Sequence, residues 1–302
     1  MRDLLAPEKA DVMERRDDIE LPNAARVAVT LTVALELWEG PYVETGYHDG
    51  PPVSVPQELL DQGYRDKATL SWQEYGPRRG MWRLLDILDR YPDVKVTTVV
   101  SGLAAERYPE VIRAYYERGH EICAHSWAQD VRTWKLTTEE ERANILRCRD
   151  VIAEVTGEAP VGWISPSAQQ GEETVRLLHE AGYRWHGDCS DDDIPYFVDV
   201  DGGGRMLAIP YQYDLNDLKV YVKGMNHAGV YVEWFQQKFD TLYAEGATSP
   251  KMVNATVHAA LYGRPYGSWA FEKVIQYARG HGGVWATSRK EIDHWMRERY
   301  DQ

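Results

Sequence analysis

The segment "HEICAHSWAQD" (residues 120–130) concentrates side chains that could bind a metal ion or move a proton. An apolar run leads into His125, as in a buried strand that continues into a reactive loop. A histidine that binds a metal from such a loop often has a second ligand about one helical turn later. Gln129 stands at that position, and an amide is a poor zinc ligand. The segment therefore predicts a functional loop, but it does not by itself predict a metal site.

A second candidate group is the pair of carboxylates in "ELWEG", Glu36 and Glu39. Glu36 directly follows "RVAVTLTVALE" (26–36), an apolar run rich in β-branched residues that is typical of a buried parallel strand. Burial of one carboxylate beside another would raise one pKa and provide an acid or base that works near neutral pH. The alternative is that both carboxylates are solvated charges in a loop, and this alternative fits Glu39 better than Glu36.

The elements that must position these residues alternate between strand-like and helix-like segments. The strand-like segments are 26–36, 94–102, 120–126, 159–165, 183–189, 205–211, 251–259 and 283–288, and the helix-like segments are 80–92, 109–119, 137–157, 172–182, 230–246, 268–282 and 289–300. The helix at 137–157 has a capping-box pattern from Thr138 to Glu141 and ends at Gly157. Seven or eight βα units without an internal repeat predict an α/β fold, as a closed or slightly open barrel rather than a doubly wound sheet.

Polar residues recur at or just past the C-terminal ends of the predicted strands. They are Glu36, Ser101, His125, Ser165, Asp188, Tyr211, His258 and Thr287. In a βα barrel that face carries the active site, so we expect these side chains to surround it. The chain is expected to form one domain, 1–302, with a charged arm at 1–20. A Gly-, Pro- and Tyr-rich insertion at 37–80 is expected to cover the mouth of the pocket.

Composition narrows the choice of partners. The formal net charge is -14 and no block of lysine and arginine occurs, so neither nucleic acid nor an anionic membrane is expected as a partner. No apolar run approaches the roughly 20 residues of a membrane span, and the N-terminal segment lacks the apolar core of a signal peptide. The 3 cysteines are expected to be reduced thiols in a cytoplasmic protein. Trp234 with Phe235 and Trp269 with Phe271 suggest a homo-oligomer.

Two motifs carry a resemblance to a known family. "GHEICAHS" (119–126) resembles the second motif of the polysaccharide deacetylase (NodB-homology) family, and "RVAVTLTVALE" resembles the first. "PVGWISPS", "DDDIPYF", "IPYQYDLND", "HAALYGRP" and "VWATSRKEIDHW" are similar to its allantoinase-like and cyclic-imide-hydrolase-like branch. The resemblance extends from about residue 20 to residue 298. It implies a distorted (β/α) barrel.

The resemblance also assigns roles to positions. In metal-dependent members, an aspartate after the first strand and two histidines of a His-x-x-x-His loop bind a divalent cation. Another aspartate acts as base, and a histidine after a late strand acts as acid. The matching positions here are Ala34 and Glu36 for the aspartates, His125 and Gln129 for the loop, and His258 for the acid. The usual base and one ligand are therefore replaced, so we expect no metal and no other cofactor. Any metal that did bind would use Glu36 and His125.

The predicted function is hydrolysis of a carbon–nitrogen bond other than a peptide bond, in a small and most plausibly cyclic amide such as a hydantoin or imide. Glu36 or Glu39 would activate water, and His258 would protonate the leaving nitrogen. His125 would orient the substrate or stabilise the oxyanion.

Further residues are candidates for substrate binding, each with a structural alternative. Trp127 and Trp163 could form an aromatic wall of the pocket or pack in the core. Asp192 and Asp193 could face N–H groups of the substrate ring or form an acidic turn, and Arg264 could contact a substrate carbonyl or be solvated. Asp130 and Ser165 lie beside the predicted strand ends.

Two alternatives to this function stay open. A metal-dependent deacetylase of N-acetyl sugars would need a cleft open to a polymer. A non-catalytic binding protein on an inherited barrel would explain the replacements at Ala34 and Gln129. Turnover of cyclic amides and of N-acetylated sugars, with metal analysis on the same sample, would distinguish the three.

Overall fold

The computed structural model describes residues 19–39, 55–56, 58–59, 62–64, 66–223 and 226–301. Its strands are β1 (Val27–Leu35), β2 (Val96–Val100), β3 (Glu121–Ala124), β4 (Gly162–Trp163), β5 (Trp185–His186), β6 (Tyr196–Asp199), β7 (Arg205–Ala208), β8 (Lys251–His258) and β9 (Val284–Ala286). Its helices are α2 (Lys67–Tyr75), α3 (Met81–Leu88), α4 (Gly102–Arg107), α5 (Pro109–Glu117), α6 (Thr138–Thr156), α7 (Thr174–Glu180), α8 (Ala228–Glu245), α9 (Pro265–Arg279) and α10 (Arg289–Tyr300). Within these ranges, no helix combines the length and apolar character needed to cross a membrane.

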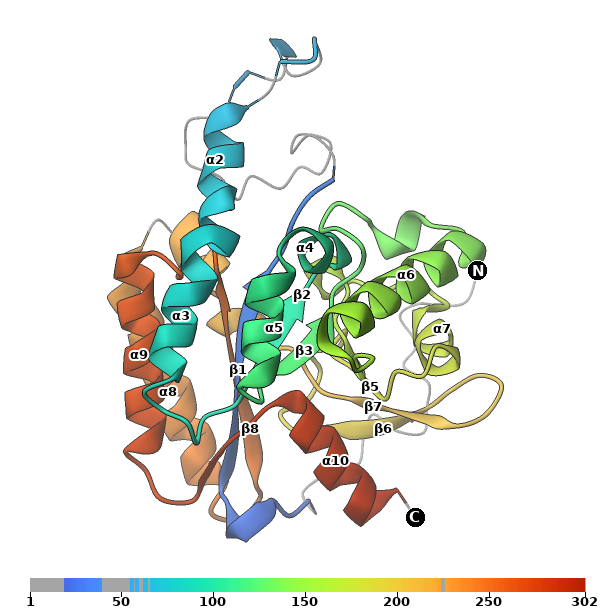
Figure 1. The fold of residues 1–302 in the computed structure, drawn as a ribbon. Coiled ribbons are helices and arrows are strands. Elements are labelled where there is room, and N and C mark those ends of the chain that lie inside the picture. Colours follow the sequence, from blue (N-terminus) through green and yellow to red (C-terminus); the bar gives the residue numbers. More distant parts are fainter. Residues whose placement is uncertain are drawn as a thin grey trace.

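The strands form one curled sheet in the order β6-β7-β5-β4-β3-β2-β1-β8, and β9 pairs with β1 beside that path. All neighbours are parallel except β6 and β7, which form an antiparallel hairpin. β1 and β8 lie side by side at the centre, with α3, α8 and α9 on one flank and α4, α5 and α6 on the other (Figure 1). The prediction of a distorted α/β barrel is confirmed.

Side chains of β1 alternate between two buried layers, because successive residues of a strand point to opposite faces. Val29 and Val33 belong to the larger core, which also contains the apolar faces of the outer helices. Ala28 and Ala34 belong to a second core, inside the barrel. Burial of both faces explains why the strand is a continuous apolar run. The inward-facing series ends at Glu36, just past the end of the strand.

The barrel is not closed by strand pairing between β7 and β8. The segment after β7 instead runs beside β8, and we call this contact the seam. The Gln212 amide nitrogen donates to the Met252 carbonyl at 2.9 Å, and the Asn254 N–H donates to the Gln212 side-chain oxygen at 2.7 Å. A single backbone bridge joins Asn216 to Thr256. One glutamine side chain thus satisfies two main-chain groups that a neighbouring strand would otherwise have bonded.

The register of β9 corrects one sequence prediction. Val284–Ala286 pairs with Val27–Val29, the first third of β1, and the N–H of Thr287 donates to the Val29 carbonyl at 3.0 Å. Thr287 therefore lies deep beside β1, not at the C-terminal face. Of the other seven residues predicted at strand ends, six follow their strands within three residues and His258 is the last residue of β8.

Other boundaries differ from the predicted ones. The hairpin strand β6 was not predicted, and α2 lies within the insertion that was expected to be irregular. The capping box of α6 uses Thr137 and Glu140, one position earlier than predicted. Residues 1–18 of the predicted arm and residues 40–54 of the predicted insertion lie outside the described residues, so the prediction that the insertion covers the pocket stays a prediction.

Candidate active site

Three side chains meet where β1, β3 and β8 end. Glu36 follows β1, His125 follows β3, and His258 is the last residue of β8. The carboxylate Oε1 of Glu36 lies 3.2 Å from His125 Nε2 and 3.5 Å from His258 Nε2. The Glu36 side chain is only 9% exposed, so water screens these charges weakly. The three residues predicted as catalytic from their strand ends are thus brought together.

His258 is held by a buried aspartate. Its Nδ1 donates to Asp217 Oδ1 at 2.6 Å, and its backbone N–H donates to Oδ2 at 2.7 Å. Because a carboxylate only accepts, Nδ1 carries a proton and Nε2 points toward Glu36. Sequence analysis missed Asp217. The sequence signal available was its place in the "IPYQYDLND" stretch, since no periodicity marks this irregular segment.

His125 is fixed from both sides of its ring. Nδ1 donates to the Ile164 carbonyl at 2.6 Å, which leaves Nε2 facing Glu36 and the side-chain oxygen of Gln129, 2.8 Å away. Both of these oxygens only accept, so Nε2 is the donor toward Glu36 and Gln129. The Nε2 edge of the ring therefore lies beside the space above Glu36.

The pKa values of Glu36 and His258 shift in opposite directions. Burial by itself would raise the pKa of Glu36, but the charge of His258 and hydrogen bonds from both histidines outweigh it and hold that pKa far below its ordinary value. Burial by itself would lower the pKa of His258, but Asp217 and Glu36 raise it well above the ordinary range. The expected raised pKa within a Glu36–Glu39 pair is therefore wrong. Glu39 is exposed, and its N–H donates to Asp130 Oδ1 at 3.0 Å.

A cavity of about 270 Å³ opens above the three residues. Its wall comes from several strand ends and from the irregular segments after β4 and β7. The lining residues are Thr32, Ala34, Glu36, Val99, His125, Gln129, Ile164, Ser167, Ala168, Tyr211, Tyr213, Asn216, Leu218, Lys219, Thr256 and His258. A space of this size suits a single small ring. Tyr211 and Tyr213 form its aromatic side, with ring centroids 5.0 Å apart and planes at 75°.

The predicted aromatic wall of Trp127 and Trp163 is wrong. Both residues belong to the outer core. The Trp127 ring lies under the guanidinium of Arg147, 3.2 Å from the ring centroid. Trp163 is fully buried, packs edge-on against Tyr183 and donates to the Ser165 hydroxyl at 2.9 Å. Both tryptophans therefore pack in the core, which was the structural alternative.

Ser165 lies next to the cavity and shapes it without lining it. Its N–H donates to Asp188 Oδ1 at 2.7 Å, and burial raises the pKa of Asp188 to about 6. Ser165 begins a tight turn in which Ser167 and Ala168 have φ of 64° and 48°, and both of these line the cavity. Ser165 therefore positions part of the wall, and its predicted direct contact with substrate is not supported.

Asp192 and Asp193 lie far from the cavity. The carbonyl of Asp193 accepts from the N–H of Met252, near the start of β8, which places it about 20 Å from His258 at roughly 3.4 Å per residue. Asp192 Oδ1 accepts from the N–H groups of Asp193 and Ile194 at 2.7 and 3.3 Å. They form an acidic turn, and the predicted contact with substrate is wrong. Asp130 holds the loop after β1 through Glu39, as described above.

Arg264 faces an outer helix instead of the cavity. Its Nε donates to the Ala260 carbonyl and its Nη2 to the Trp72 carbonyl, both at 3.0 Å. The guanidinium carbon lies 3.6 Å from the Trp72 ring centroid and 4.1 Å from that of Tyr75. The predicted substrate contact is not seen. Arg264 instead joins α2 to the loop that follows His258.

The donor set does not fit a catalytic metal site. Such a site normally needs three protein ligands and one open position. Gln129, at the position of the second loop histidine, is hydrogen-bonded to His125, and an Asp130 oxygen accepts from the Glu39 N–H. Within the described part of the chain, no group of three or more His, Cys, Asp or Glu side chains is arranged to hold a metal ion.

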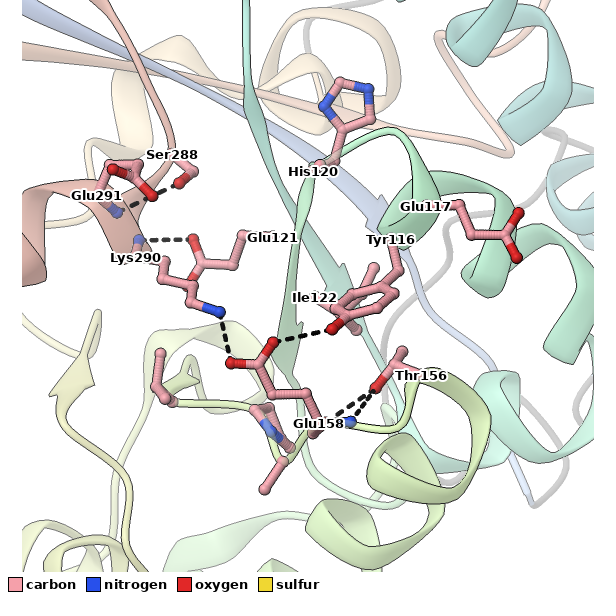
Figure 2. A pocket seen from close by; sticks show the side chains of 14 residues that line it. Tyr116, Glu117, His120, Glu121, Ile122, Thr156, Glu158, Ser288, Lys290 and Glu291 are labelled. Atoms are coloured by element: carbon pink, nitrogen blue, oxygen red, sulfur yellow. Dashed lines mark hydrogen bonds and ion pairs between the residues drawn. The ribbon is translucent and has the colours of Figure 1, made fainter.

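A larger cavity, of about 400 Å³, lies at the opposite end of the barrel, beside the start of β3. Figure 2 shows that two of its carboxylates, Glu158 and Glu121, both bind Lys290. Glu158 accepts from Lys290 Nζ at 2.6 Å and from the Tyr116 hydroxyl at 3.0 Å. Glu121 accepts from the Lys290 N–H at 2.8 Å. Charges that pair with one another at the N-terminal ends of the strands stabilise the fold. Because a βα barrel carries its active site at the C-terminal ends of the strands, the smaller cavity is the candidate active site.

A carboxylate and a carboxylate-backed histidine at the C-terminal face of a curled βα barrel supply the base and the acid that hydrolytic enzymes use. Comparison with known proteins agrees. The polysaccharide deacetylase family profile matches residues 64–186, which include the His125 loop. A crystal structure of PuuE allantoinase is 30% identical and superposes with a TM-score of 0.84, covering 98% of this chain and 100% of that one.

Two further relatives support the assignment. A probable polysaccharide deacetylase from Pseudomonas aeruginosa PAO1 is 34% identical, with a TM-score of 0.79 and coverage of 92% of this chain and 93% of that one. A putative polysaccharide deacetylase from Schizosaccharomyces pombe is 27% identical over 90% of each chain. The chain belongs to the polysaccharide deacetylase (NodB-homology) family, with an allantoinase-like character. It is accordingly a hydrolase of carbon–nitrogen bonds other than peptide bonds.

Proposed function

We propose that this protein hydrolyses a ring amide bond in a small cyclic amide, such as a hydantoin or an imide. The observation that carries the proposal is the pairing of Glu36 with the Asp217-backed His258 beneath a cavity of about 270 Å³. That volume suits a single ring, and Tyr211 and Tyr213 offer it an aromatic surface. Similarity to an allantoinase over nearly the whole chain supports the same substrate class.

The geometry supports a base–acid mechanism. Glu36 accepts a proton from water as the water oxygen bonds to the ring carbonyl carbon. His258 Nε2 then gives its proton to the ring nitrogen as the carbon–nitrogen bond breaks, which leaves a carboxylic acid and an N–H group on the opened chain. The acid ionises in water, and the proton taken up by Glu36 returns to His258. The low pKa of Glu36 keeps the carboxylate ionised but makes it a weak base. Glu36 therefore takes the proton late, when the forming O–C bond has made the water proton acidic.

The developing oxyanion needs fixed donors, since we propose catalysis without a resident metal. His125 Nε2 faces the space above Glu36 and is placed to donate to that oxygen. The poor fit of the donor set to a metal site supports this proposal. Elemental analysis of purified protein should show well under one metal ion per chain, and a chelator should leave activity intact. A full equivalent of bound metal that activity requires would overturn the metal-free mechanism.

The proposal extends to partners and compartment. The partner is a small-molecule amide, without nucleic acid or membrane. Cys123, Cys148 and Cys189 are all free thiols, which agrees with a reducing, cytoplasmic location. Homo-oligomer formation remains a prediction. Phe235 and Phe271 are buried, so the prediction now rests on Trp234 and Trp269 alone, which are 39% and 50% exposed.

The test is a panel of hydantoins, cyclic imides and N-acetylated sugar oligomers, assayed with wild type and two variants. Glu36→Gln and His258→Ala should each lower kcat/KM on a cyclic amide about 10²–10⁴-fold, the usual range for positioned proton transfer. His294→Ala, on the exposed face of α10, is the matched control and should leave activity unchanged. Full activity of His258→Ala on a real substrate would contradict the mechanism.

A second candidate function is deacetylation of an N-acetyl sugar, because the relatives from P. aeruginosa and S. pombe are named as a probable and a putative polysaccharide deacetylase. The same base and acid could cleave an acetamide. Release of acetate from N-acetylglucosamine oligomers, faster than ring opening of any cyclic amide, would favour it. A non-catalytic binding barrel would be favoured if small rings raise the melting temperature without being hydrolysed.

A further inference from the structure

A second and much smaller space adjoins Glu36 and His258. Its volume is about 20 Å³, and it shares both side chains with the larger cavity. The remaining wall is mainly apolar, with Leu35, Ala260 and Leu261 among its residues. A space of about 10–15 Å³ is enough for one water molecule, provided that polar partners are present. This space is therefore large enough for one water and too small for a ring.

The polar side chain that completes the space is Gln73 of α2. It is 8% exposed, and its amide nitrogen has no hydrogen-bond partner among the described residues. Buried donors are nearly always satisfied by protein or by ordered water, so an unpaired one indicates a missing partner. Gln73 lines the same space as Glu36 and His258. Gln73, whose amide nitrogen is unpaired, thus lines a space that a carboxylate and a histidine also line.

The backbone around Gln73 is held firmly against the loop after β8. Arg264 donates to the carbonyl of Trp72, the residue before Gln73. Gly76, three residues on, packs so closely that an added Cβ would lie 3.2 Å from the Ala260 nitrogen. Contacts on both sides of Gln73 therefore fix its position relative to His258. Such fixed geometry is what a residue that positions a reactant requires.

We propose that this space holds the hydrolytic water and that Gln73 is its positioning residue. The Gln73 amide donates to one lone pair of the water, and Glu36 accepts one of its protons. The second lone pair faces the ring carbonyl carbon in the larger cavity. When the water attacks, its O–H bond breaks toward Glu36 and a new O–C bond forms. The kinetic part of this inference rests on the proposed function, whereas the water site itself does not.

The water site is tested by crystal structures of wild type and of Gln73→Leu, a variant of similar volume that lacks the donor. Wild type should show an ordered water within about 3.2 Å of both the Gln73 nitrogen and the Glu36 carboxylate. That water should be absent or displaced in Gln73→Leu. A dry space in wild type, or a Gln73 amide bonded to another protein group, would overturn the inference whatever the substrate is.

Kinetics test the positioning role. Gln73→Leu should lower kcat about 100-fold, the scale of misplacing a reactant by about 1 Å, with KM changed less than about twofold. Gln73→His, which restores a donor, should recover part of kcat. Hydroxylamine can enter with the substrate, so the ratio of hydroxamate to hydrolysis product should rise in Gln73→Leu.

The matched control is Gln237→Leu on the exposed face of α8, where the amide donates to Glu233, and its kcat should equal that of wild type. A raised KM with unchanged kcat in Gln73→Leu would show a substrate contact and reject the positioning role. If wild type opens no ring although the water is present, the proposed function fails while the water site stands.

Discussion

At the scale of single residues, the active site is a row of charges in which His258 lies between Glu36 and Asp217. Each carboxylate stabilises the imidazolium, and the imidazolium stabilises Glu36. Glu36 has a folded-state pKa below its unfolded value, so its contribution to stability is present above about pH 4.5 and is lost as pH falls through the lower pKa. His258 has a raised pKa, so its contribution is complete below about pH 6.5 and is lost as pH rises through the raised value. The ion pair is therefore fully stabilising between about pH 4.5 and 6.5.

The same shifts predict the pH dependence of catalysis. The acid limb of kcat/KM should lie below pH 4.5, where Glu36 protonates, and the basic limb should lie well above pH 6.5, where His258 loses its proton. Asp217→Asn removes the charge that raises the pKa of His258. Its basic limb should therefore move toward lower pH, and kcat should fall. A pH–rate profile from about pH 4 to 10 measures both. An unchanged basic limb in Asp217→Asn would show that Asp217 only fixes the ring.

At the scale of elements, α2 is held to the loop after β8 by one side chain. Arg264→Leu removes two hydrogen bonds to carbonyls and the contact with the Trp72 ring. We expect faster amide hydrogen exchange in α2 and a several-fold lower kcat, because Gln73 loses its fixed position. Global stability should fall by about 1–3 kcal/mol, the sum of modest hydrogen-bond and cation–π terms.

Arg279→Leu is the control for Arg264→Leu, since it breaks an exposed ion pair with Asp93 and a contact with the Tyr91 ring, neither of which involves α2. Hydrogen exchange followed by mass spectrometry distinguishes the two variants. Equal exchange in α2 for both would mean that other contacts hold this helix.

The elements also show what the sequence could predict. β1 and β8 could be predicted because strands buried on both faces are continuous apolar runs. Glu36, His125 and His258 could be predicted as site residues because they stand at the ends of predicted strands. Trp163 could not be placed, since adjacent residues of a strand point to opposite faces and periodicity alone does not say which face is inside the barrel. Asp217 and Gln73 reach the site by tertiary packing of other segments, so no local pattern identifies them.

At the scale of the whole molecule, the barrel depends on the seam made by Gln212. Gln212→Leu keeps the volume but leaves the Met252 carbonyl and the Asn254 N–H without their partner. Each buried unsatisfied group costs about 1–3 kcal/mol, so the free energy of unfolding should fall by about 2–6 kcal/mol in a urea titration. Gln276→Leu, on the exposed side of α9, is the control and should change stability by less than about 0.5 kcal/mol. A loss below about 1 kcal/mol in Gln212→Leu would mean that water replaces the amide at the seam.

The pairing of β1 with β8 also determines when the active site can exist during synthesis. The side chain of Asn254 on β8 bonds to Thr30 on β1, which precedes it by 224 residues. A ribosome adding about 5–20 residues per second needs about 10–45 s to cover that interval. Through this time the nascent chain carries β1 with one edge unpaired, a state open to association with other chains. Glu36 meets His258 only when one of the last strands to be synthesised takes its place, so an incomplete chain that lacks β8 has only part of the candidate active site.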